Sequence, residues 1–111
     1  VRPGRGERAG RIGSLLLGVP GPDGLEYVGR VGTGFTNVAL EALGSRLAGL
    51  RRETSPFVAV PEAEASTAQW VTPTLVGEVE FAEWTDGGIL RQARWRGLRA
   101  DTRPEDVVRE P

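Results

Sequence analysis

Two apolar runs separated by a turn sequence constrain the fold of this chain most strongly. Residues 12–19 and 25–33 each have the length of a β-strand, and Pro20-Gly21-Pro22-Asp23-Gly24 between them is rich in turn-forming residues. The sequence therefore predicts a β-hairpin over residues 12–33. Residues 1–11, which contain several glycines and arginines, are expected to form a basic loop.

One stretch has helical periodicity. Four leucines from Leu40 to Leu50 recur at helical spacing, and Thr36 is placed to cap the first turn, so a helix is expected over residues 36–50. Residues 51–74 contain prolines and a run of small and acidic residues. This composition predicts a long surface loop.

A second hairpin is expected over residues 75–99. Residues 75–84 alternate apolar and acidic side chains, and Asp86-Gly87-Gly88 then provides a turn into an arginine-rich strand. The sequence Thr102-Arg103-Pro104-Glu105 has the pattern of a capping box with proline in the first helical turn. It predicts a short helix over residues 102–109.

The arginine-rich segment contains the most distinctive chemistry. It reads Ile-Leu-Arg-Gln-Ala-Arg-Trp-Arg-Gly-Leu-Arg-Ala-Asp-Thr from residue 89 to residue 102, with four arginines in nine residues around Trp95. Guanidinium groups bind phosphate oxygens in bidentate fashion and keep their charge, so such a strand suits a polyphosphate or a nucleic-acid backbone. The alternative is a solvated basic edge strand that protects the sheet from aggregation.

Composition limits what the chain can do alone. Its 111 residues are enough for one domain, and a hydrophobic content of 39% allows a modest core. Cysteine, histidine and lysine are all absent, so the chain offers no thiol or amine nucleophile, no imidazole base and no zinc site. No membrane segment or secretory signal is visible, and a net charge of −1 argues against indiscriminate binding to nucleic acid.

Four segments match the motifs of one known family in content, order and spacing. They are residues 8–19, residues 27–35, residues 70–79, and the series Arg91, Arg94, Trp95, Leu98, Arg99 and Asp101. Together they resemble the C-terminal OB-fold domain of ATP-dependent DNA ligases. The sequences Leu-Leu-Leu-Gly-Val and Gly-Leu-Arg are most similar to the bacterial ligases of non-homologous end joining.

The resemblance implies an OB-fold Greek-key barrel, an all-β fold with one or two helices. The predicted order of strand, strand, helix, strand, strand agrees with this fold from its second strand onward. The first strand is expected to be truncated, with Val1 as its last residue, which leaves the barrel open along one edge. Such an edge can recruit a strand from another chain.

The resemblance also implies roles for individual residues. Arg99 and Asp101 match the arginine and the acid of the family's last motif, where they are expected to act as catalytic residues, with Arg99 on the β and γ phosphates of ATP. An ion pair with Asp101 or a nearby glutamate is the alternative for Arg99. Thr102 replaces the lysine of the motif, so either ATP is activated less efficiently or a neighbour such as Arg103 supplies the missing phosphate contact. We interpret Thr102 itself as a helix cap.

Other arginines are candidates for the remaining contacts. Strand alternation places Arg94 and Arg96 on one face, as further nucleotide contacts, and Arg91 with Trp95 on the other. The expected DNA contacts are Arg30, Arg8, Arg11 and Arg91. The three tryptophans could stack on bases, but packing in the core or at its rim is favoured.

The family further implies the setting of the reaction. A parent enzyme would use ATP and Mg²⁺ to adenylate a lysine in a nucleotidyltransferase domain of the same chain, and would act on nicked or broken duplex DNA in the bacterial cytoplasm, at the nucleoid. A Ku-type end-binding protein is a further expected partner, and a membrane is not. The fragment alone is expected to be inactive and to bind no cofactor or metal. Two alternatives stay open: a free-standing OB module for single-stranded nucleic acid, and an RNA-capping or RNA-ligating relative.

Overall fold

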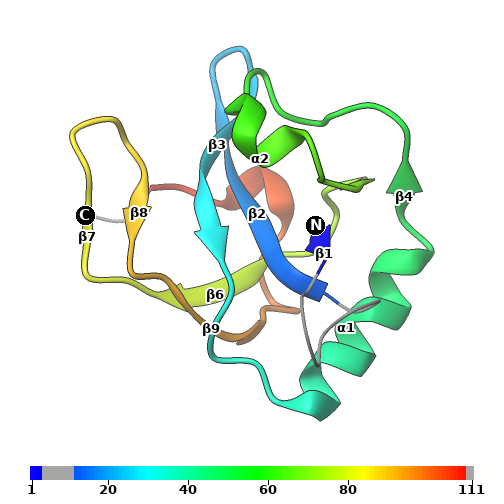
Figure 1. Cartoon of the computed structure of the whole chain (residues 1–111). Helices are drawn as coiled ribbons and strands as arrows, with labels where there is room; N and C mark the ends of the chain where they lie inside the picture. The colour runs from blue at the N-terminus through cyan, green and yellow to red at the C-terminus, as the bar shows by residue number, and fades with distance from the viewer. Residues whose placement is uncertain (4–11, 110–111) are drawn as a thin grey trace.

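The computed structural model of this chain describes residues 1–3 and 12–109 (Figure 1). The strands form a three-stranded sheet, β1-β2-β3, and three two-stranded ladders, β4-β5, β6-β9 and β7-β8, all antiparallel. The elements in chain order are β1 (Arg2–Pro3), β2 (Ile12–Gly21), β3 (Gly24–Val31), α1 (Asn37–Ala48), β4 (Arg51–Arg52), α2 (Glu62–Ala65), β5 (Trp70–Val71), β6 (Gly77–Glu80), β7 (Glu83–Trp84), β8 (Leu90–Arg91), β9 (Arg94–Leu98) and the 3-10 helix η2 (Pro104–Asp106).

The hairpin β2–β3 is the longest ladder. Its tip is closed by the pair Gly21 and Gly24, and Gly24 has a φ of 134°, which side chains other than hydrogen rarely allow. The register shifts by one residue at Leu17/Gly18, where a bulge bends the strand. The hairpin supplies several residues of the core, including Val31, which has no exposed surface.

Part of the first eleven residues is a strand rather than a loop. Arg2 pairs with Ser14 and Pro3 with Ile12. Val1 and Gln69 exchange both backbone hydrogen bonds, with N···O distances of 2.8 and 2.7 Å. The expectation of a loop is therefore wrong for Arg2–Pro3, because backbone pairing with distant segments overrides the local composition. Residues 4–11 lie outside the described part of the chain.

Helix α1 lies within the range that the leucine spacing predicts. The Thr36 hydroxyl accepts a hydrogen bond from the Ala39 N–H at 3.0 Å, which satisfies one of the free N–H groups of the first turn. Leu40 and Leu43 are each only 4% exposed. They join the core cluster, which consists of Ile12, Leu15, Val31, Leu40, Leu43 and Trp95.

The segment 51–74 is not one unbroken loop. Its ends pair with each other as β4 and β5, with Arg51 opposite Val71 and Arg52 opposite Trp70. The single turn α2 lies between them, after Pro61. The prediction of a long loop is wrong at these points, because a two-residue strand is too short to produce a recognisable alternation of side chains.

The C-terminal segment also differs from the prediction. The expected helix over residues 102–109 is reduced to the 3-10 turn η2, whose N-cap residue is Arg103 and whose cap has no side-chain hydrogen bond. Thr102 therefore does not cap a helix. A single turn of three residues is too short for the reciprocal bonds of a capping box.

A backbone hydrogen bond connects β9 to the segment just beyond β3: the Trp95 N–H donates to the Thr33 carbonyl oxygen at 2.8 Å. The Arg99 N–H donates to the Val76 carbonyl oxygen at 2.7 Å and so extends the β6-β9 ladder by one bond. The described strands do not close into a barrel, but an arrangement of mostly strands with two helices is consistent with an OB-fold. Within residues 1–3 and 12–109, no helix has both the length and the apolar character of a membrane span.

Candidate nucleotide and nucleic-acid interface

The arginine-rich segment is divided into two strands. Gln92 has a φ of 57°, in the left-handed region, and separates β8 from β9. The strand alternation that would place Arg91 on the same face as Trp95 does not continue across this break. Arg91 is exposed and Trp95 is buried, so the predicted pairing of these two residues on one face is wrong.

A bulge in β9 determines which way the last motif faces. Trp95 pairs with Val79 and Gly97 pairs with Glu78, so Arg96 is an extra residue with no partner in β6. In a regular strand, Trp95 and Leu98 would point to opposite faces because they are three residues apart. The extra residue turns both toward the core, where Trp95 is 7% exposed and Leu98 packs against the core cluster. Arg99, which follows Leu98, consequently lies on the exposed face.

Three nitrogen atoms of Arg99 donate to carboxylates. Nε and Nη2 donate to the two oxygens of Asp101, each at 3.0 Å, and Nη1 donates to Glu78 Oε1 at 2.8 Å. Hydrogen bonds with Asp101 and then with Glu78 raise the pKa of Arg99 above its usual range, and the hydrogen bond with Arg99 is the largest cause that lowers the pKa of Asp101. The ion pair that was the alternative interpretation of Arg99 is thus present.

The neighbouring arginines are paired in the same manner. Arg96 Nη1 lies 2.6 Å from Glu80 Oε1, and Arg91 Nη1 lies 2.9 Å from Glu83 Oε1. Arg94 is exposed and has no ion pair within the described ranges. A nearby glutamate was expected as a partner of Arg99, but Glu80 and Glu83 were overlooked as partners of Arg96 and Arg91. The presence of acidic residues in the strand opposite the arginines of the predicted second hairpin is the sequence signal that would have identified them.

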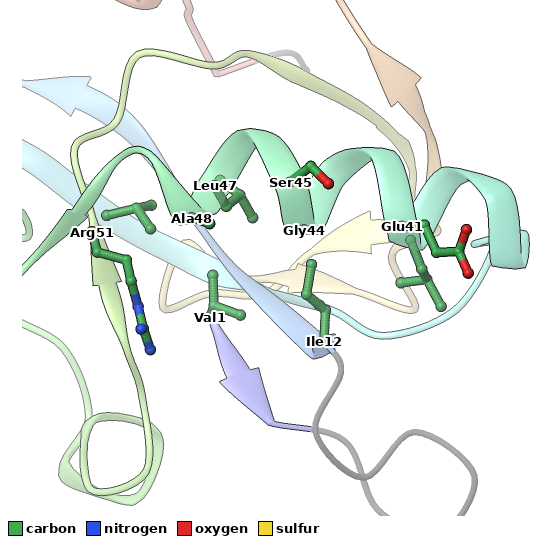
Figure 2. Close-up of a pocket in the computed structure, with 10 residues that line it drawn as sticks. Val1, Ile12, Glu41, Gly44, Ser45, Leu47, Ala48 and Arg51 are labelled. Carbon is green, nitrogen blue, oxygen red and sulfur yellow. The ribbon is translucent and has the colours of Figure 1, made fainter.

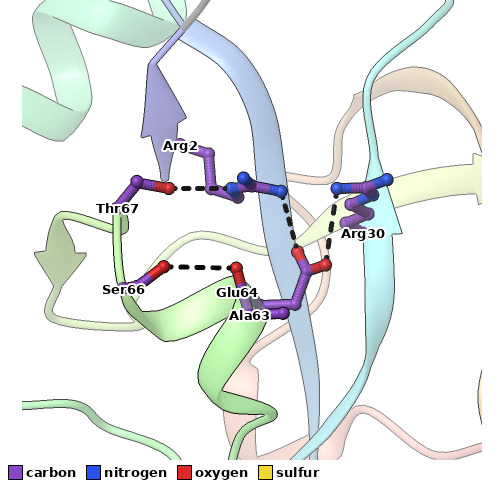
Figure 3. A network of polar contacts seen from close by, with 6 residues as sticks. All are labelled: Arg2, Arg30, Ala63, Glu64, Ser66 and Thr67. Atoms are coloured by element: carbon purple, nitrogen blue, oxygen red, sulfur yellow. Dashed lines mark hydrogen bonds and ion pairs between the residues drawn. The ribbon is translucent and has the colours of Figure 1, made fainter.

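Arg30 belongs to a different network (Figure 3). The Glu64 carboxylate in α2 lies between two guanidinium groups, 3.3 Å from Arg2 Nη1 and 3.4 Å from Arg30 Nη1. Arg2 Nε also donates to the Thr67 hydroxyl at 3.1 Å. The Arg30 side chain is 53% exposed, whereas Glu64 is only 17% exposed. The network fixes α2 against β1 and β3 and leaves part of the Arg30 guanidinium accessible. Arg8 and Arg11 lie outside the described residues.

The tryptophans differ in what they can contact. Trp95 is stacked on Phe35, with ring centroids 5.4 Å apart, and is buried in the core. Trp84 is half-buried and lies 5.1 Å below the Arg109 guanidinium, and Trp70 is half-buried against the edge of Phe57. The core position of Trp95 leaves it unavailable for stacking on a base.

Two hollows differ in their relation to these residues, because only the smaller one is lined by Arg99. A groove of about 660 Å³ runs along α1 and is lined mostly by apolar side chains, with Glu41 and Arg51 as its charged residues (Figure 2). A smaller cavity of about 220 Å³ is lined by the polar residues Glu78, Arg99, Thr102 and Asp106 together with mostly apolar residues of β2, β3, the β6–β8 region and the C-terminal tail. Arg99 and its acidic partner therefore lie at the wall of an apolar cavity. No cluster of three or more acidic residues suited to a metal ion is found in the part of the chain that the structure describes.

Comparison with known proteins identifies the family. A family model described as the C-terminal region of ATP-dependent DNA ligase matches residues 8–102. The chain belongs to this ligase family. The resemblance found in the sequence motifs is thereby confirmed, and Arg99 and Asp101 lie inside the matched region.

Curated relatives of this chain also belong to the ligase family. The chain is 50% identical over 110 residues to the multifunctional non-homologous end joining DNA repair protein LigD of Mycobacterium tuberculosis, and 51% identical over 110 residues to LigD of Mycolicibacterium smegmatis. Each alignment covers 98% of this chain but only 14% of the relative. The chain thus spans about a seventh of the length of the curated ligases that it matches.

Solved structures that resemble this chain are likewise ligases of the same family. The crystal structure of the ligase domain from M. tuberculosis LigD has a TM-score of 0.92 and 49% sequence identity, and the match covers 98% of this chain and 35% of that one. A mycobacterial DNA ligase D complexed with ATP and MES has a TM-score of 0.84 and 51% identity, covering 92% of this chain and 34% of that one. The fold of this ligase-family chain is therefore that of the corresponding third of the LigD ligase domain.

Proposed function

We propose that this chain acts as the C-terminal domain of an ATP-dependent DNA ligase of the bacterial end-joining type. In this proposal Arg99 and Asp101 assist adenylation of a lysine, and the arginines on the surface hold nicked or broken duplex DNA. The observation that carries the proposal is the match of residues 8–102 to the ligase family together with the exposed position of Arg99. The names of the relatives support DNA repair as the setting.

The nucleophile must come from elsewhere, because the chain has no lysine. The contribution of Arg99 would be to orient the leaving pyrophosphate in line with the attacking amine, which a planar guanidinium can do without exchanging a proton. In this proposal any Mg²⁺ that accompanies ATP is held by the nucleotidyltransferase part of the parent enzyme.

Phosphate binding by Arg99 requires an exchange of partners. Its Nε and both Nη atoms donate to Asp101 and Glu78, whose side chains are 70% and 47% exposed. Exposed ion pairs contribute little net stability, and a triphosphate has more charge and more acceptor oxygens than a carboxylate. We infer that Asp101 and Glu78 hold the guanidinium outward until a phosphate replaces one of them.

The DNA-binding part of the proposal rests on Arg30 and Arg91, with Arg8 and Arg11 as additional candidates, while Arg94 and Arg96 are proposed as further nucleotide contacts. These residues lie on more than one element, and Arg30, Arg91 and Arg96 are partly neutralised by glutamates. A Ku-type end-binding protein and a location at the bacterial nucleoid complete the proposal. The alternative of a free-standing single-strand binder is disfavoured, because Trp95 is buried and the net charge is −1.

The first prediction concerns covalent labelling. Incubated with radiolabelled ATP and Mg²⁺, the 111-residue chain should acquire no covalent AMP, because it has no lysine to form the phosphoramidate. The same chain joined to its nucleotidyltransferase part should become labelled. Label that stays on the isolated chain after denaturation would contradict the assignment of the nucleophile to another domain.

The second prediction concerns DNA affinity. With a net charge of −1 and most of its described arginines in ion pairs, the chain can contact only a few phosphates at once. It should therefore bind nicked duplex DNA in the micromolar range or more weakly, with an affinity that falls as salt rises. Fluorescence anisotropy at several salt concentrations measures both quantities. Nanomolar, salt-insensitive binding to single-stranded DNA would instead favour the free-standing module.

A further inference from the structure

Arg51 and Arg52 differ from most other arginines of the chain. Seven of the described arginines form ion pairs with carboxylates: Arg2, Arg30, Arg91, Arg96, Arg99, Arg103 and Arg109. Arg51 and Arg52 have no acidic partner within residues 1–3 and 12–109. Arg51 Nη2 donates to the Gln69 side-chain oxygen, and Arg52 Nη2 donates to the Thr54 hydroxyl at 3.1 Å. Both acceptors are neutral, so the two positive charges are not compensated.

The other two arginines without an acidic partner in the described ranges have local explanations. Arg46 lies in the last turn of α1, where the partial negative charge of the helix end attracts a cation. Arg94 lies on β9 and belongs to the face already proposed for the nucleotide. No comparable local explanation applies to the adjacent pair Arg51 and Arg52.

The ladder β4-β5 holds the two side chains at the rim of a groove. Arg52 is opposite Trp70 and Arg51 is opposite Val71, so adjacent arginines project from opposite faces of a two-residue strand. Both nevertheless line one open groove of about 450 Å³, together with Glu53, Ala68, Gln69 and Trp70. Two guanidiniums against one carboxylate give the groove a net positive charge. Trp70 adds an aromatic surface, half-buried against Phe57.

This corner is separate from the strands of the second hairpin. In Figure 1, β4 lies beyond the C-terminal end of α1, on the opposite side of the molecule from β7 and β8. Figure 2 shows the Arg51 side chain extending away from α1 rather than lying along it. A ligand bound here would leave the Arg99 region free.

Adjacent like charges without counter-ions repel each other, and a bound anion relieves this repulsion. A guanidinium group with a neutral partner also loses less interaction energy when a phosphate replaces that partner than a guanidinium in a bidentate ion pair does. We propose that Arg51 and Arg52 form a second binding surface for the phosphate backbone of duplex DNA, with Trp70 against the adjoining sugar. This inference rests on the proposed function for its ligand and adds a contact surface to it.

The test is a salt titration of DNA binding by the 111-residue chain. Each phosphate contact contributes about 0.9 to the slope of log K against log salt, so Arg51→Gln with Arg52→Gln should reduce the magnitude of the slope by about 1.8. Arg51→Lys with Arg52→Lys keeps the charge and should largely preserve the slope. The matched control is Arg46→Gln with Arg103→Gln, which changes the net charge equally and should leave the slope unchanged. Circular dichroism confirms that each variant is folded.

Three results would overturn the proposal, and they point to different causes. If the unaltered chain binds and the Arg51/Arg52 double variant keeps its slope, this surface is not used, although DNA stays a partner. If the slope of the control variant falls as much as that of the Arg51/Arg52 double variant, the total charge of the chain rather than this groove determines the salt dependence. If the unaltered chain binds no duplex DNA even at low salt, both this surface and the DNA-binding part of the proposed function fail.

Discussion

Replacing Trp95 by alanine should lower the free energy of unfolding by about 3–5 kcal/mol, the range for truncating a large aromatic residue in a core. Trp95 is 7% exposed and stacks on Phe35. Its six-membered ring also lies directly over Gly77, where an added Cβ would be 2.5 Å from Cζ3. A small domain has a total stability of about 5–15 kcal/mol, so the variant should lose a large fraction of that stability.

Urea denaturation followed by far-ultraviolet circular dichroism measures this loss without depending on tryptophan fluorescence. Trp95→Phe retains an aromatic ring against Phe35 and should lose clearly less than the alanine variant. Trp84→Ala is the second comparison, because Trp84 is only half-buried and should be less costly to remove. Equal and small losses for Trp95→Ala and Trp84→Ala, below about 1 kcal/mol, would contradict the position of Trp95 at the centre of the core.

Replacing Arg99 by alanine should slow self-adenylation of the full-length ligase by more than tenfold. The physical reason is the loss of the group that we propose orients pyrophosphate, an interaction needed only in the adenylation step. Sealing of nicks that already carry AMP should be largely spared. Single-turnover measurements of the two steps on one preparation separate these effects.

The matched control for Arg99 is Arg109→Ala. Arg109 is also exposed and pairs with an acidic residue, Glu26, but no role in the reaction is proposed for it. Its removal should leave both steps within about twofold of the unaltered enzyme, as expected for a surface ion pair. An equal loss in adenylation and sealing for Arg99→Ala would indicate a role in folding or DNA binding instead.

The parts of the fold that the sequence predicts well depend on local signals. The turn between residues 20 and 24 and the cap at Thr36 act within a few residues, so the hairpin β2–β3 and helix α1 lie where these signals indicate. Strands β1, β4 and β5 were missed because each has two residues and is stabilised by a distant segment. Backbone pairing of this kind leaves no periodic pattern in the sequence.

The candidate site was predictable in its composition but not in its geometry. The motif around Arg99 is visible in the sequence, and the family match covers it. The face on which this motif lies depends on the left-handed conformation of Gln92 and on the bulge at Arg96. Neither feature can be recognised from the alternation of apolar and polar residues along a strand. The acidic partners Glu78 and Glu80 depend on the register between β6 and β9, which the extra residue shifts.

The bulge in β9 means that the exposed position of Arg99 depends on Arg96 staying outside the ladder. If Arg96 paired with β6 as a regular strand residue, the faces after Trp95 would be reversed: Leu98 would be exposed to water and Arg99 would point toward the core. Gly97, with a φ of 146°, permits the conformation that accommodates the additional residue. A one-residue insertion that pairs in the ladder between Trp95 and Arg99 should therefore reverse the two faces, whereas deletion of Arg96 should keep Leu98 toward the core and Arg99 exposed. In evolution, such an insertion should be tolerated less than a substitution of Arg96.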